Sequence, residues 1–231
     1  MSTIKAGMDF FATDGDAYFT IPHGVPIHEH FFHKGSAQWT GLIRFQGAPF
    51  RKFKDPRTGN EYATGEADTA MARAQDVTIE KLPGSGKTEI ELVALSLRSC
   101  NPIEVHVGRH VQRWDVRVSV SRSRPSKGTM TINQTNPDGG TFDSEFVIVP
   151  EFDFVRQADG EEKHLDFGAM KIPPERQTLV ARISTLQAAD VPWHTSAPED
   201  TLAVAGATTN FAVPRIAHHS HSVVAVRAVL Q

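Results

Sequence analysis

Four histidines fall within eleven residues, and no other feature of this sequence is better suited to chemistry. They lie in the segment His23-Gly-Val-Pro-Ile-His28-Glu-His30-Phe-Phe-His33. Side chains two apart on a β-strand point to the same side, so His28 and His30 could share one metal ion. The pattern predicts a divalent transition-metal site on this pair, with surface or subunit-contact histidines as the alternative. Candidates for a third ligand are His33, His218, His219 and His221.

The same segment is similar to the first motif of the cupin family. His28-x-His30-x3-Lys34-x6-Gly41 has that spacing, but Lys34 stands where the family has a Glu ligand, and an ammonium cannot bind a metal. The second cupin motif needs a His after Pro-x-Gly, whereas residues 140–144, which follow Pro137-Asp-Gly139, contain none. The resemblance therefore implies a cupin-like metalloprotein as the second hypothesis and not the first.

Tryptophan offers a different chemistry, because flat indole rings stack on sugar rings. Trp114 belongs to an apolar strand face, which leaves Trp39 and Trp193 as candidate ligand-binding residues. A carbohydrate-binding module that uses Trp39 or Trp193 is the third hypothesis.

Other catalytic patterns are incomplete. Gly84-Ser-Gly-Lys-Thr88 resembles the end of a phosphate-binding loop, but position 81 is Lys where Gly is needed, and the residues that follow alternate like a strand. The sequence has no Gly-x-Ser-x-Gly elbow, and its single cysteine, Cys100, fits a small packed side chain. We expect Asp115, Asp143 and Asp153 to lie solvated on wet strand faces. These observations favour a protein that is not an enzyme and needs no cofactor, with the divalent metal as the alternative.

The elements that position these residues are predicted to be strands, because side chains alternate with a period of two. In Gln112–Arg122, Trp114, Val116, Val118 and Val120 share one face and polar residues share the other. The stretches 91–97 and 223–230 are apolar on both faces, which predicts central positions. Between Thr88 and Leu97 the apolar face changes over, and a bulge near Leu92 would explain the change.

Turn residues separate these strands. Asn136-Pro-Asp-Gly-Gly140 and Ala158-Asp-Gly160 predict hairpins, and Pro83-Gly-Ser-Gly86 predicts a turn between 77–82 and 88–97. The stretch Asp55–Gln75 lacks large apolar residues and predicts a long surface loop, with a helical turn at most in 68–74. Residues 196–214 are similarly rich in small side chains.

The sequence thus predicts an all-β, jelly-roll-like antiparallel β-sandwich of about 12 to 15 short strands with very little helix. A single domain over residues 1–231 can hold them, and a division near 158–175 into two smaller sandwiches is the alternative.

Charge and hydropathy exclude some classes of partner. Lys and Arg number 24 against 27 Asp and Glu, so no cationic excess is present to bind nucleic acid. The longest apolar stretches are shorter than the roughly 20 residues that span a bilayer. We expect neither a membrane span nor a secretory signal in this sequence, which fits a cytoplasmic protein or the mature part of an exported one.

A wider pattern resembles a group of uncharacterised, usually exported, β-rich bacterial proteins. It includes Phe31-Phe32-x2-Gly35-Ser36, Gly41-x-Ile43 and Gly47-x-Pro49, and it continues through Trp114-Asp-Val116 and Gly139-Gly-Thr-Phe-Asp-Ser144. The resemblance implies no catalytic residue, does not require the histidines, and implies an extracellular or cell-envelope location. The leading hypothesis is therefore a non-enzymatic structural or binding protein that associates with another protein or with itself.

Overall fold

The computed structural model describes residues 1–13, 17–21, 23, 26–169 and 185–194, and side chains are described outside 146 and 185–194. Seventeen strands and no helical residue occur in this part of the chain. The predicted all-β, antiparallel, sandwich-like class is confirmed, with more strands than the sequence suggested. Within the described residues no helix has the length and apolarity to cross a membrane.

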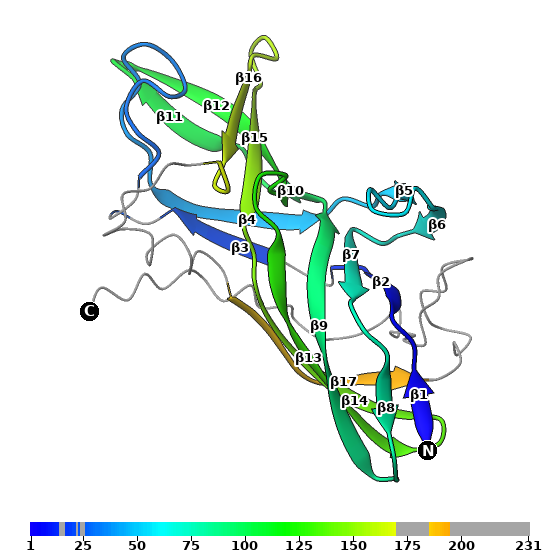
Figure 1. Cartoon of the computed structure of the whole chain (residues 1–231). Coiled ribbons are helices and arrows are strands. Elements are labelled where there is room, and N and C mark those ends of the chain that lie inside the picture. The colour runs from blue at the N-terminus through cyan, green and yellow to red at the C-terminus, as the bar shows by residue number, and fades with distance from the viewer. Residues whose placement is uncertain (14–16, 22, 24–25, 170–184, 195–231) are drawn as a thin grey trace.

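Two large antiparallel sheets form the body of the molecule, and we name them sheet I and sheet II (Figure 1). Sheet I has seven strands, in the order β16 (Glu162–Asp166), β15 (Pro150–Arg156), β12 (His110–Val120), β10 (Leu97–Ser99), β4 (Gly41–Gly47) and β3 (Ala17–Ile21), with β11 (Ile103–Val107) also paired to β12. Sheet II has six, in the order β17 (Thr185–His194), β14 (Gly139–Val147), β13 (Ser126–Asn136), β9 (Gly84–Leu95), β7 (Thr69–Arg73) and β2 (Gly7–Phe11).

Two short two-stranded sheets complete the described fold: β1 (Ser2–Ile4) with β8 (Val77–Ile79), and β5 (Arg51–Lys54) with β6 (Glu61–Gly65). The chain crosses repeatedly between the large sheets. For example, β9 ends at Leu95 in sheet II and β10 begins at Leu97 in sheet I. Figure 1 shows the result: β4 of sheet I runs horizontally, while β9 of sheet II runs vertically. Both sheets are strongly curled.

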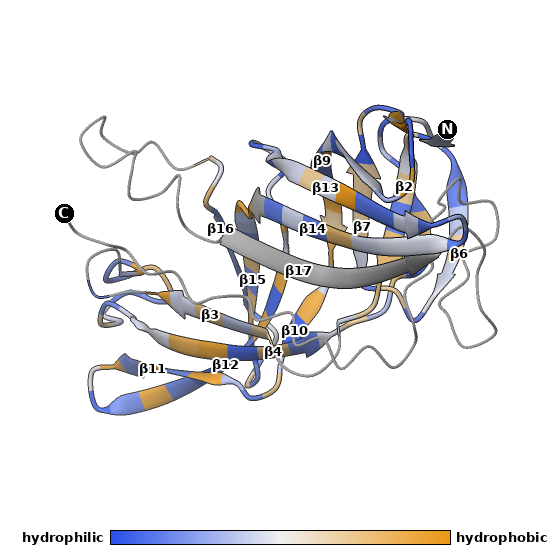
Figure 2. Cartoon of the chain, turned by 90° about the horizontal axis from the view of Figure 1, so that it is seen from below, coloured by the Kyte–Doolittle hydropathy of each residue, from blue (hydrophilic) through white to orange (hydrophobic). Residues whose placement is uncertain are grey.

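The strand patterns of the sequence are largely confirmed. Along β12 the side chains of Trp114, Val116 and Val118 are buried and the intervening residues are exposed. Figure 2, which is coloured by hydropathy, shows the matching bands of hydrophilic and hydrophobic residues along this strand. The bulge is also confirmed, because Ala70 pairs with Ala94 while the next residue, Met71, pairs with Leu92, which leaves Val93 as the extra residue. The hairpins β13–β14 and β15–β16 enclose the predicted turns.

Two predictions about turns and loops are wrong. Asp55–Gln75 is not one long loop, because it contains β6 and β7, and 69–73 is strand where a helical turn was expected. Pro83–Gly86 is not simply a turn either: Gly84 opens β9, and β8 pairs with β1. A β-carbon on Gly86 would lie 2.3 Å from Val77 Cγ1, so glycine permits this close approach. Gly84–Thr88 is therefore strand, as expected for a sequence that is not a phosphate-binding loop.

The main core lies between the sheets and draws on both. Its largest fully buried side chains include Trp114, Phe19, Phe32, Phe45, Phe152 and Phe154. A second, smaller core packs Ala70 and Ala72 of β7 with Met8, Phe10 and Tyr62. Because both faces of β7 are covered, small side chains are needed there, which explains why its sequence does not look like a strand. The predicted buried stretch 223–230 and the loop 196–214 lie outside the described residues.

Candidate functional site

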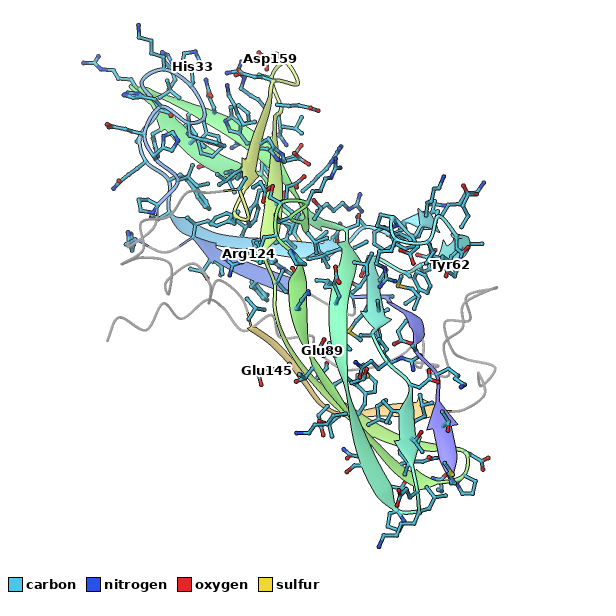
Figure 3. All side chains as sticks on the ribbon, in the orientation of Figure 1. His33, Tyr62, Glu89, Arg124, Glu145 and Asp159 are labelled. Carbon is cyan, nitrogen blue, oxygen red and sulfur yellow. The ribbon has the colours of Figure 1, made fainter. Side chains whose placement is uncertain are left out.

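Residues 26–39, which carry His28, His30 and His33, form a loop at the end of sheet I where β11 and β12 meet. A bridge between Ile27 and Trp39 closes the loop, and a bridge from Ser36 to Val107 attaches it to β11. Phe32 anchors it, with its ring centroid 5.3 Å from that of Trp114 and 5.1 Å from that of Phe154. The aromatic pair Phe31-Phe32 thus has a structural role, while His33, labelled in Figure 3, is exposed on the loop.

The premise that His28 and His30 share one face of a strand is wrong. His28 is not in a strand, residues 29–35 are turns and bends, and His30 has a left-handed φ of 67°. Each ring uses its Nδ1 locally: His28 donates to Glu29 O (2.7 Å), His33 donates to Lys34 O (2.8 Å), and His30 accepts from Gly35 N–H (2.9 Å).

These three histidines form no three-ligand set of their own. Within the described residues, one set of three or more His, Cys, Asp or Glu side chains has ligand atoms within 4.8 Å of one another, and it is Glu151, Asp153 and His164. His218, His219 and His221 lie outside the described residues. The metal site on His28 and His30 therefore stays a prediction.

The two candidate sugar-binding tryptophans belong to different sheets. Trp39 is half-buried beside sheet I, where its Nε1–H donates to Glu104 O (3.1 Å) and its ring approaches Gly41 so closely that a β-carbon there would lie 3.0 Å away. Trp193 belongs to β17 in sheet II, opposite Gly140, and its side chain lies outside the described ones. Carbohydrate binding stays a prediction.

The carboxylate–histidine set lies on the hairpin of β15 and β16, whose tip carries Asp159 (Figure 3). Asp153 and His164 are directly opposite in the ladder, and Glu151 is two residues along β15 on the same face. His164 Nδ1 lies 2.8 Å from Asp153 Oδ1, and Nε2 lies 3.8 Å from Glu151 Oε1. The inward residues Phe152 and Phe154 fix the alternation, because both are in the core.

Burial differs sharply across this set. The side chain of His164 is 53% exposed and that of Asp153 is 49% exposed, but that of Glu151 is only 8% exposed. Glu151 is the second residue of β15, just after the chain crosses from β14 of sheet II, and it lies opposite Ser119 of β12. In the described part of the chain, the side chain of Glu151 makes one ion pair, to His164 at 3.8 Å, and no hydrogen bond.

The charges around His164 favour its protonated form. The hydrogen bond with Asp153 raises the pKa of His164, burial opposes this, and the carboxylates of Glu151, Asp153 and Asp166 add to the increase. Asp166 is engaged elsewhere, with Ser123 Oγ donating to it at 2.6 Å and the Gly168 amide at 2.7 Å. Burial alone would raise the pKa of Asp166, but these hydrogen bonds outweigh burial and lower it.

The sequence analysis missed this set. Asp153 was expected to be solvated, and neither Glu151 nor His164 was singled out. The available signal was the alternation Glu151-x-Asp153 before the Ala158-Asp-Gly160 turn, since folding the hairpin about that turn brings His164 opposite Asp153. The burial of Glu151 has no local signal, because it depends on the neighbouring strand and the sheet crossover.

No family model, no curated protein and no solved structure matches this chain. The resemblance to exported β-rich bacterial proteins therefore stays a prediction.

Proposed function

We propose that this protein is a non-enzymatic β-sandwich protein that works by self-association, through the edge of sheet I formed by β3. The observation that supports the proposal is a contrast between the two edge strands of this sheet. β16 carries Glu162, Lys163, His164 and Asp166 among its five residues, whereas β3, Ala17-Tyr-Phe-Thr-Ile21, carries no ionisable acid or base other than a tyrosine.

Edge strands present backbone N–H and C=O groups that pair with other chains unless charges, proline or a cover prevents it. β16 has the charges that block such pairing. In the described part of the chain β3 is paired on one side, with β4, and has neither charge nor proline. An edge of this kind is suited to the addition of another strand.

A second copy of β3 is the partner that this strand suits best. In a twofold dimer the same strand meets itself antiparallel, so a charged edge would repel its own copy and an uncharged one does not. The half-buried Thr20 lies opposite Leu42 of β4, which is 59% exposed. These two residues place neutral side chains beside the edge, next to the exposed Arg44 of β4, which lies opposite Tyr18.

The test is the solution mass of the full chain and of Thr20→Lys, measured by sedimentation equilibrium. The wild type should be a dimer, and Thr20→Lys should be a monomer with an unchanged far-ultraviolet spectrum, because a lysine on an edge strand opposes the addition of another strand. Val111→Lys is the control: Val111 is 48% exposed on β12, which is not adjacent to β3, and this variant should remain dimeric. A monomeric wild type, or a dimer that persists in Thr20→Lys, would refute the proposal.

A further inference from the structure

From the hairpin of β15 and β16, at the opposite edge of sheet I from β3, we infer a site for one divalent transition-metal ion, held by Glu151, Asp153 and His164 on the outer face of these two strands. The inference rests on this geometry and not on association through β3. A negative result in the metal titration therefore leaves the dimer proposal standing, and a negative result in the mass measurement leaves the metal site standing.

The ligand types and their positions fit such an ion. An imidazole nitrogen with two carboxylate oxygens is a donor set for ions such as Zn²⁺, Co²⁺ or Mn²⁺. Bonds of about 2.0 to 2.2 Å to a tetrahedral ion place ligand atoms roughly 3.3 to 3.6 Å apart. His164 Nδ1 lies 2.8 Å from Asp153 Oδ1, and its other ring nitrogen, Nε2, lies 3.8 Å from Glu151 Oε1. One ligand atom from each of the three side chains lies within 4.8 Å of the other two, so small side-chain rotations bring one imidazole nitrogen and both carboxylates around a common ion. The half-exposed His164 ring has room to turn toward the shared position.

Glu151 supplies a second observation that favours a bound cation. Its side chain is more than nine-tenths buried, it points to the same spot as Asp153 and His164, and no hydrogen-bond donor satisfies it in the described residues. A buried carboxylate is ordinarily paired or bound to a metal. His164 at 3.8 Å is beyond hydrogen-bonding distance and already bonded to Asp153 through Nδ1.

Charge balance points the same way. Within the set, two carboxylates and one protonated imidazole carry a net charge of minus one, and Asp166, opposite Glu151 on β16, adds a further negative charge nearby. A divalent ion bound to the two carboxylates and a neutral imidazole brings the charge of the set itself to zero. Arg117 lies opposite Asp153 on β12 but makes no ion pair with either carboxylate in the described structure. Three protein ligands also leave at least one coordination position for water or another donor, on the exposed side of the hairpin.

The experiment is calorimetric titration of the chelator-treated full chain with ZnCl₂, followed by titration with CoCl₂ and visible spectroscopy. One equivalent should bind, and Glu151→Gln, Asp153→Asn and His164→Ala should each weaken its affinity by about 100-fold or more, since even outer-shell changes cost 10- to 100-fold. The shape-preserving Glu151→Gln guards against a variant that merely fails to fold, and far-ultraviolet spectra verify that all three fold.

Two controls separate this site from other histidines. Asp115→Asn removes a carboxylate of β12 that accepts a hydrogen bond from Gln157, and this variant should still bind one equivalent of metal. The double variant His28→Ala, His30→Ala should also retain it. If the wild type binds no equivalent of Zn²⁺ or Co²⁺, or if the equivalent survives in His164→Ala, the inference is refuted. Loss in the His28, His30 variant alone would equally refute it, in favour of the histidine loop.

Discussion

The buried ion pair between Asp9 of β2 and Arg73 of β7 gives the sharpest stability prediction. Their side chains are 1% and 0% exposed, with Arg73 Nε 2.8 Å from Asp9 Oδ2 and Nη2 3.3 Å from Oδ1. Arg73 Nη1 also donates to the carbonyl of Lys5. The guanidinium thus joins the edge of sheet II to the N-terminal segment.

Removing one partner leaves the other charge buried. Arg73→Met should therefore lower the free energy of unfolding by about 3 to 5 kcal/mol, and Asp9→Val by a similar amount. The double variant replaces the pair by apolar side chains, and it should lose no more than about one of the single losses. The coupling free energy from the cycle is then at least about 3 kcal/mol.

Urea unfolding of the four proteins, followed by circular dichroism, measures this cycle. Losses below about 1 kcal/mol for Arg73→Met, or a double variant whose loss equals the sum of the two single losses, would refute the reasoning that burial and pairing act together.

Three further predictions concern single positions. Burial raises the pKa of Asp68 above its value in the unfolded chain, despite hydrogen bonds from Thr13 and Thr69. The folded state therefore holds the proton more tightly, and the free energy of unfolding falls as pH rises between the unfolded and folded pKa values. Asp68→Asn should flatten this slope when urea unfolding is measured at several pH values, and an unchanged slope would contradict the prediction. A β-carbon on Gly140 would lie 2.0 Å from the Asn133 carbonyl oxygen. Gly140→Ala should therefore lower the free energy of unfolding by about 1 to 3 kcal/mol, measured by thermal unfolding. An unchanged stability would contradict this and show that the strand can move to admit the methyl group. The hydrogen bond from Arg156 lowers the pKa of Asp159 to about 2. The ionised Asp159 therefore stabilises the fold fully above its ordinary pKa of 3.8, and this stabilisation is lost as pH falls through about 2. Asp159→Asn should abolish this loss, which is measured as the melting temperature against pH.

The sequence predicts those parts of the fold that local pattern decides. β12 alternates clearly because one of its faces packs in the core, and the change of face near Leu92 is visible because a bulge shifts the parity of the side chains. β7 could not be predicted in the same way. Its alanines are small because both faces are covered, and this reflects the packing of distant segments and not the strand itself.

The candidate site was harder to predict for a related reason. His28 and His30 looked like a pair only if their segment was extended, and the left-handed φ of His30 turns it into a loop. Asp153 looked solvated because its own strand gives it a polar face. Its partner His164 follows from hairpin register, and the burial of Glu151 follows from the crossover between sheets, so neither shows in the local sequence.

The central claim is that sheet I continues into a second copy through β3, and hydrogen exchange tests it most directly. About half of the amides of an edge strand point away from their one neighbour, so a dimer should protect residues 17–21 more strongly in concentrated than in dilute solution, while β16 exchanges equally in both. Equal exchange of β3 at both concentrations would contradict the account.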